Sequence, residues 1–257
     1  MFGMTRLRRW WTQRILSHHR IPMKVWRRVV RETPLLSQLQ KSELGKLREL
    51  ASLFLHDKVV VGAGDFELDA FMRVTIAAQA SLLVLNLGLD WYDGWSEVIV
   101  YPDAFIVSRP ELDEAGVVHE NSRGLSGEAW SRGPVILSWA DIDPSIQHHS
   151  GSNVVLHEFA HKLDFLDGSA NGIPPLHPGN QQQEWAKDFS RAYDDLSHHS
   201  FSHSGGIDRY ATTNPAEFFA VMTELFFEDP MRLQQHYPTI YNELQRFYRQ
   251  DPIRRLI

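Results

Sequence analysis

Apolar residues along the chain follow two different spacings, which predict helices in some segments and strands in others. Leucines spaced three and four apart over 35–55, and an Ala- and Leu-rich run over 66–87, predict two helices in the first half. Short runs rich in Val, Ile and aromatic residues, separated by Pro, Gly and Asp, predict strands over 97–101, 104–107 and 135–139. These elements predict an N-terminal lobe of mixed helices and strands.

Helical spacing dominates the second half of the chain. Apolar residues surround almost the whole helix that is predicted directly after Asn153, which indicates that this helix is buried. A second helix is predicted after Asn214, and further helices over 181–196 and 230–257. A loop rich in Gly and Pro is predicted over 168–180. The sequence therefore predicts an α+β protein that is mostly helical with a small mixed sheet.

The helix after Asn153 carries a motif in which His157 and His161 are four residues apart. Residues at this spacing project from one helix face, one turn apart, so their imidazoles can hold one Zn²⁺ ion. Glu158 directly follows the first histidine and is placed to act as a general base. Two unrelated histidines on a surface helix are the alternative, but that reading predicts polar surroundings, whereas this helix is apolar almost all round.

A catalytic zinc site needs a third protein ligand, and the second helix offers two candidates. Asn214 and Pro215 are typical of a helix start, which places Glu217 in the first turn. An acid at that position is also a common capping residue. Glu224 lies seven residues further on and projects from nearly the same face. Spacing alone leaves both candidates open.

Several polar residues near the motif have two readings each. Tyr210 could donate a hydrogen bond to an oxyanion, or be an ordinary half-buried aromatic residue. Asp164 could fix the tautomer of a ligand histidine, or lie solvated near the helix end. Residues 197–206 could form a second metal site or close the first as a fourth ligand, but their Ser and Gly content favours a polar loop, a candidate flap. The histidines of that segment are His198, His199 and His203.

Charge is distributed unevenly. Residues 1–31 hold nine of the chain's 26 basic residues and no acid, so the other 17 stand against 32 acidic residues. A basic segment containing Trp10, Trp11 and Trp26 fits contact with nucleic acid or anionic lipid, or packing against the acidic remainder. We favour packing, and the acidic remainder argues against direct nucleic-acid binding.

The chain contains no cysteine, which excludes disulfides and thiolate zinc ligands and leaves His and carboxylate as the metal-binding groups. The longest apolar run, over 76–89, is interrupted by Gln79, Ser81 and Asn86, so no membrane span is predicted. The basic N-terminus lacks the unbroken apolar stretch of a signal peptide. We therefore expect a cytoplasmic protein.

The sequence around the motif supports a more specific reading. The strings HEFAHKLD over 157–164 and NPAEFFAV over 214–221 resemble the Mlc titration factor A family, a group of glucose-regulated zinc metallopeptidases. The likeness runs from about residue 25 to about residue 250 and is strongest from Val135 onward. The family is also similar around its active site to the catalytic domain of anthrax lethal factor. This resemblance implies a zincin-like fold with a gluzincin ligand set.

Carried over by position, the resemblance implies that His157, His161 and Glu217 bind one zinc ion per chain. It implies that Glu158 is the general base and that Tyr210 assists at the oxyanion. The choice of third ligand is thus made by analogy and not by spacing.

We expect residues 1–24 to form a basic N-terminal arm and 25–257 a single zincin-like catalytic domain. Within it we expect a mixed lobe to about 150, zinc-site helices over 153–229 and a helical C-terminal end. In zincin-like folds a strand such as 135–139 lines the cleft and pairs with extended substrate. Family members are described as cytosolic, aminopeptidase-like proteins that bind the Mlc repressor. The resemblance implies a zinc peptidase that also binds a repressor of sugar uptake genes; a non-catalytic protein that sequesters this repressor is the alternative.

Overall fold

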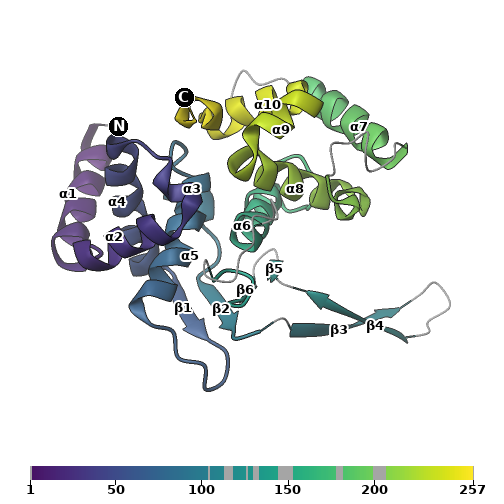
Figure 1. The fold of residues 1–257 in the computed structure, drawn as a ribbon. Coiled ribbons are helices and arrows are strands. Elements are labelled where there is room, and N and C mark those ends of the chain that lie inside the picture. The colour runs from purple at the N-terminus through teal and green to yellow at the C-terminus, as the bar shows by residue number, and fades with distance from the viewer. Residues whose placement is uncertain are drawn as a thin grey trace.

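The fold is α+β and mostly helical, with a four-stranded sheet and a separate two-stranded ribbon (Figure 1). The computed structural model describes residues 2–103, 105–112, 118–125, 127–129, 133–143, 153–177, 182–198 and 207–256. For residues 2–9, 105–112, 118–125 and 127–129 only the backbone is described. None of the helices in these ranges has both the length and the apolar character needed to cross a membrane.

The first part of the chain folds into a group of packed helices. They are α1 (Phe2–His19), α2 (Met23–Glu32), α3 (Pro34–Ser37), α4 (Lys41–Asp57) and α5 (Ala70–Leu83). Helix α4 packs against both α1 and α5, and α2 also contacts α5. Helix α5 is buried along nearly its whole length, so it forms the centre of this group.

Polar caps make two of these helices shorter than the apolar spacing predicts. The helical pattern over 35–55 is interrupted before Lys41, where the backbone N–H of Gln40 donates to the Glu43 carboxylate at 3.0 Å. Helix α5 begins only after Asp69, whose side chain accepts a hydrogen bond from the N–H of Met72 at 2.8 Å. These side-chain bonds satisfy N–H groups that would otherwise lack partners at a helix start.

The sheet has the order β1-β2-β6-β5. Strands β1 (Val59–Gly62), β2 (Glu97–Tyr101) and β6 (Val135–Ser138) are parallel, and β5 (Gly127–Ala129) pairs antiparallel with β6. Strands β2 and β6 match predicted strands, whereas β1 and β5 were not predicted. Because β6 has β2 on one side and β5 on the other over 135–137, it is not open there to substrate, and that expectation is corrected: β5 forms this edge.

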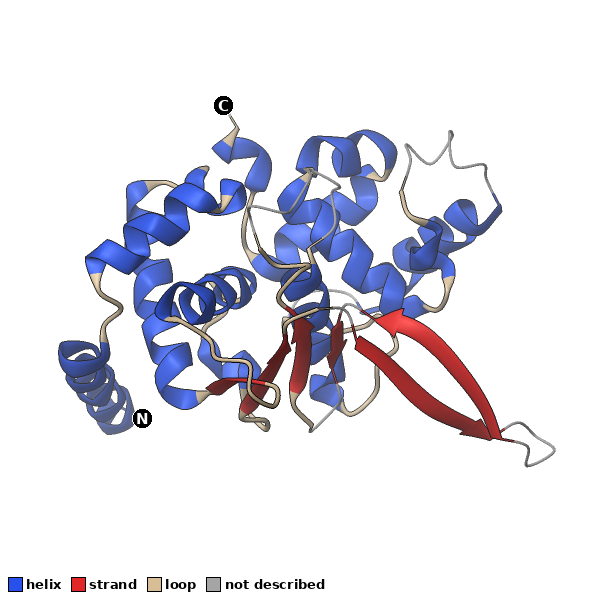
Figure 2. Ribbon diagram, turned by 60° about the horizontal axis from the view of Figure 1, so that its bottom comes forward, coloured by secondary structure: helices blue, strands red, loops and turns tan. Residues whose placement is uncertain are grey.

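A long antiparallel ribbon projects from the body of the molecule (Figure 2). It consists of β3 (Phe105–Leu112) and β4 (Val118–Leu125), with Phe105 opposite Leu125. The strand predicted over 104–107 is the beginning of β3, with Ala104 outside the described residues. Strand β4 was not predicted, since His, Glu, Asn, Ser and Arg interrupt its apolar pattern.

The second half supplies the helices that surround the predicted zinc motif. They are α6 (Val154–Asp164), α7 (Gln182–His198), α8 (Pro215–Glu228), α9 (Pro230–His236) and α10 (Pro238–Tyr248). Single 3₁₀ turns lie at Leu89–Tyr92, Phe165–Asp167, Arg209–Thr212 and Pro252–Arg255. Helix α6 packs against α5 and the β5–β6 edge of the sheet as well as against α8, so it lies at the centre of the molecule (Figure 1).

An aromatic cluster anchors α6 to the first half of the chain. The ring of Phe159 lies 5.7 Å from that of Phe54, 5.3 Å from Tyr92 and 5.6 Å from Trp95, measured between centroids. Tilted and edge-on rings at these separations are favourable aromatic arrangements. This packing fixes the apolar face of α6 and so orients its polar face toward α8.

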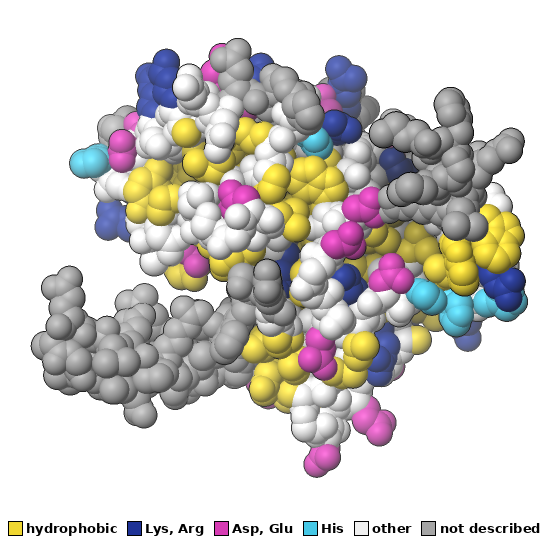
Figure 3. Space-filling model, turned by 180° about the vertical axis from the view of Figure 1, so that it is seen from behind, with side chains coloured by type: hydrophobic (Ala, Val, Ile, Leu, Met, Phe, Trp, Pro, Cys, Tyr) yellow, Lys and Arg dark blue, Asp and Glu magenta, His cyan; other side chains and the backbone are white. Residues whose placement is uncertain are grey.

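The basic N-terminal segment is helical and packs on the body of the protein through the contact of α1 with α4. Directly after α1, Arg20 forms an ion pair with Glu49 at 2.5 Å. Trp10 and Trp11 remain about half exposed, at 49% and 53%. On the face seen in Figure 3, the described Lys and Arg side chains are scattered among Asp and Glu.

Candidate metal centre

Helix α6 begins and ends where the sequence predicts. The side chain of Asn153 accepts the N–H of Leu156 at 3.1 Å, and Gly168 closes the following 3₁₀ turn in a left-handed conformation with φ of 98°. His157 and His161 project from one face of the helix, with side chains only 12% and 10% exposed. The core packing of α6 therefore fixes the direction of both imidazoles.

Helix α8 brings the third group. Asn214 accepts the N–H of Glu217 at 3.0 Å, and Pro215 occupies the first turn, as the sequence predicts. This cap places Glu217 in the first turn of α8, with its side chain 17% exposed and directed at α6.

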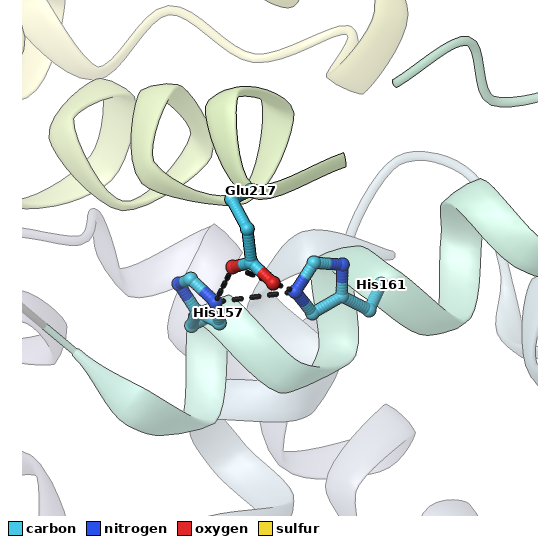
Figure 4. A group of neighbouring side chains, drawn as sticks. All are labelled: His157, His161 and Glu217. Carbon is cyan, nitrogen blue, oxygen red and sulfur yellow. Dashed lines mark hydrogen bonds and ion pairs between the residues drawn. The ribbon is translucent and has the colours of Figure 1, made fainter. Parts of the chain in front are cut away.

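His157, His161 and Glu217 converge on one point between α6 and α8 (Figure 4). The Nε2 atoms of the two histidines are 3.2 Å apart, and Glu217 Oε2 lies 2.9 Å from the first and 3.4 Å from the second. Ligands at 2.0–2.1 Å from a tetrahedral zinc ion are separated by about 3.3 Å. Two imidazole nitrogens and a carboxylate oxygen at these separations therefore fit a metal ion.

Two of these side chains, His157 and Glu217, have shifted pKa values. Burial alone would lower the pKa of His157, but the carboxylates of Glu224 and Glu217 raise it well above its ordinary value. Burial alone would raise the pKa of Glu217, but its contacts with His157 and His161 hold it well below its usual range. In the absence of a metal, a proton on His157 thus balances an ionised Glu217.

Glu224, the other candidate third ligand, contacts the other nitrogen of the same imidazole. Its Oε1 lies 2.6 Å from Nδ1 of His157, and its Oε2 accepts the backbone N–H of Asn153 at 2.5 Å. A carboxylate that accepts from Nδ1 keeps a proton on that nitrogen, so in the neutral ring Nε2 carries the lone pair that can bind a metal. Glu224 lies seven residues after Glu217, and the structure brings it to Nδ1 of His157 and not to the metal position.

The remaining predicted site residues lie near this group. Glu158 is buried on α6, with 4% of its surface exposed. Tyr210 lies in a 3₁₀ turn before α8, 40% exposed, with its ring 6.0 Å from the ring of His157. The structure thus brings both residues to the same region as the three converging atoms.

Asp164 matches neither of its two readings. It is fully buried, and its Oδ2 accepts the backbone N–H of Gly172 at 2.8 Å, so a solvated Asp is wrong. Its Oδ1 accepts no hydrogen bond from the described residues. Burial raises the pKa of this carboxyl to about 6, against the opposing effect of the Gly172 hydrogen bond.

The histidines of the predicted polar loop do not add to this group within the described part of the chain. His198 ends α7, is exposed, and contacts the carbonyl oxygen of Asp194 at 2.6 Å through Nδ1. His199 and His203, and with them the predicted flap, lie outside the described residues. His157, His161 and Glu217 are the one cluster of three potential metal ligands that the described residues form.

Sequence reasoning missed further polar residues around α6. Gln79 and Glu228 both accept hydrogen bonds from the Asn153 amide, each at 2.6 Å. Lys162 is buried, donates to the carbonyl of Gly133 at 2.8 Å, and has a pKa lowered by burial to about 8. Two features of the sequence could have indicated these residues: Gln79 lies in an otherwise apolar predicted helix, and Lys162 lies in a helix predicted to be buried.

Comparison with known proteins places this chain in a family. The model of the family described as glucose-regulated metallo-peptidase M90 matches residues 7–249, and the chain belongs to this family of metallopeptidases. The chain is 39% identical to Mlc titration factor A of Escherichia fergusonii over 226 residues, 87% of this chain and 85% of the relative. It is 36% identical to the protein of that name from Shigella dysenteriae serotype 1 over 250 residues, 96% and 93% of the two chains. The resemblance stated from the motif strings is confirmed.

Proposed function

We propose that this protein is a zinc-dependent peptidase with a zincin-like catalytic domain over 25–257. One observation carries the proposal: in a metallopeptidase family member, Nε2 of His157, Nε2 of His161 and Oε2 of Glu217 converge at separations that suit a tetrahedral metal ion. These three residues would hold one zinc ion per chain. Such an ion acidifies water and polarises a peptide carbonyl.

The residues of the chain have distinct roles in the proposed reaction. Glu158 accepts a proton from the attacking water and delivers it to the departing amine. Tyr210 donates a hydrogen bond to the carbonyl oxygen as negative charge develops there, and its exposure leaves the phenol accessible to a bound peptide. Glu224 holds Nδ1 of His157 and keeps Nε2 directed at the metal position.

Metal analysis and peptide hydrolysis test this function together. We expect about one zinc per chain, and a loss of hydrolysis of at least about a hundredfold in Glu158→Gln. The matched control is Glu184→Gln, which alters an exposed carboxylate on α7 and is expected to leave hydrolysis unchanged. Substoichiometric zinc, or full activity in Glu158→Gln, would overturn the proposal. Aminopeptidase-type cleavage predicts faster hydrolysis of substrates with a free N-terminus than of blocked ones.

We propose a second function, capture of an Mlc-type transcriptional repressor in the cytoplasm. The name shared by the relatives, Mlc titration factor A, supports it. A pull-down with purified repressor separates the two functions. If Glu158→Gln abolishes hydrolysis but retains the repressor, binding is independent of catalysis; if neither form retains it, the second function is overturned.

A further inference from the structure

Asn153 makes hydrogen bonds to two other helices besides capping its own. Its side-chain Oδ1 caps α6 through Leu156, while its Nδ2 donates to Gln79 of α5 and to Glu228 of α8, both at 2.6 Å. Its backbone N–H donates to Glu224 of α8 at 2.5 Å. The residue is 2% exposed, so these bonds form in a region shielded from water.

A neutral donor is needed at this position because two acids flank it. Glu224 and Glu228 are one turn apart on α8, a spacing at which like charges repel. Asn153 lies between them and donates one N–H to each carboxylate. The backbone N–H serves Glu224 and the side-chain amide serves Glu228, while the side-chain oxygen still accepts from Leu156, because an amide carries both donors and an acceptor.

The bonds of Asn153 lead to the metal-ligand position. Anchoring of its amide by Gln79 and Glu228 fixes its backbone N–H, which holds Oε2 of Glu224, whose Oε1 holds Nδ1 of His157. We propose that Asn153 is a positioning residue for the metal site: it orients Glu224 and thereby the imidazole of His157. This inference rests on the proposed zinc function, and it adds to the site a positioning residue that is not itself a metal ligand.

Helix capping and positioning make opposite predictions for one substitution. Asp caps helices as well as Asn does, so a residue that only caps α6 tolerates Asn153→Asp. A positioning residue does not, because the substituted side chain would add a third carboxylate beside two others and has no N–H to donate. The matched control is Asp69→Asn, which exchanges the same two residue types at the exposed cap of α5, where the side chain accepts the N–H of Met72.

A second variant distinguishes lost positioning from general damage. In the double variant Asn153→Asp with Glu228→Gln, the new amide at 228 can donate to the new carboxylate, which restores the bond with reversed polarity. Glu228→Gln alone keeps an acceptor for the Asn153 amide, and its zinc affinity is the reference against which recovery in the double variant is measured. Zinc affinity is measured by competition with a chromophoric chelator, and circular dichroism establishes that each variant is folded.

We expect Asn153→Asp to weaken zinc binding at least about tenfold, Asp69→Asn to leave it unchanged, and the double variant to regain most of the loss. Wild-type affinity in Asn153→Asp, an equal loss in Asp69→Asn, or no recovery in the double variant would overturn the inference.

A metal-free readout keeps this test separate from the proposed function. The Nδ1–H···Glu224 bond of His157 gives a downfield proton resonance in ¹⁵N-histidine-labelled protein, identified by its disappearance in His157→Gln. We expect Asn153→Asp to shift or broaden it and Asp69→Asn to preserve it; an unchanged resonance in Asn153→Asp also overturns the inference. Failure of the wild type to bind zinc overturns the proposed function alone.

Discussion

Glu224 and Nδ1 of His157 are joined at 2.6 Å, a contact between α8 and α6 that spans 67 positions in the sequence. Because this carboxylate holds the nitrogen that does not face Glu217 and His161, it orients the imidazole without occupying the metal position. Helix α8 therefore supports the predicted metal site in two ways: Glu217 faces the metal position, and Glu224 holds the imidazole that extends from α6.

Replacement of Glu224 by Gln is expected to weaken zinc binding about 10–100-fold. Glu224 accepts from His157 through Oε1 and from the Asn153 N–H through Oε2, and the substitution replaces one of these oxygens by an NH₂ group that faces a donor instead of accepting from it. The control is Glu243→Gln, a buried Glu on α10 that pairs with Arg246, and it is expected to leave zinc affinity unchanged. Equal affinities of wild type and Glu224→Gln would contradict this role.

Zinc binding at pH 7 is expected to release a proton from His157. Glu224 and Glu217 raise its pKa well above the ordinary value in the metal-free protein, overcoming burial, so the ring is protonated there, whereas a ligand imidazole must be neutral. The apparent affinity for zinc therefore rises with pH until that pKa is passed. Calorimetric titrations in phosphate and in Tris report the proton as a difference in binding enthalpy, and identical enthalpies after correction for buffer–zinc binding would refute the prediction.

Gly172→Ala is expected to destabilise the protein more than Gly168→Ala. Both glycines have positive φ, of 76° and 98°, so each substitution incurs backbone strain of about 1–2 kcal/mol. A Cβ at Gly172 would also lie 2.5 Å from the carbonyl oxygen of Pro215, whereas one at Gly168 meets nothing within 4 Å. We expect an additional loss of about 1–3 kcal/mol for Gly172→Ala in urea unfolding. Equal losses would show that the loop moves away from α8 at little cost.

Asp164 is expected to make the metal-free protein less stable as pH rises. Burial raises its pKa in the folded protein from 3.8 to about 6, so the folded state binds more protons than the unfolded state between these values. The free energy of unfolding then falls across pH 4–6, by up to about 3 kcal/mol from this group. Asp164→Asn removes that contribution and keeps an acceptor for Gly172. Unfolding of both proteins with a chelator from pH 4 to pH 8 measures it, and parallel pH profiles would rule it out.

Local sequence signals predicted the beginnings of the two metal-site helices. Asn153 and Asn214 cap their own helices three residues on, and such bonds depend only on neighbouring residues. Short strands were harder to predict: β1 has four residues and β5 three, and pairing with neighbours far along the chain stabilises them. The burial of Asp164 could not be predicted for the same reason, since its contact with Gly172 depends on the path of a loop and not on neighbouring residues.

By itself the sequence determined which residues can bind a metal: four-residue spacing on a helix directs His157 and His161 to one side, whatever surrounds them. It left both Glu217 and Glu224 open as the third ligand, because a seven-residue separation puts both on one face of α8. The tertiary structure distinguishes the two carboxylates by the nitrogen of His157 that each one contacts. Helix α8 lies against α6 so that Glu217 meets Nε2 and Glu224 meets Nδ1. The packing of two helices, and not the pattern within either, fixes which nitrogen each carboxylate reaches.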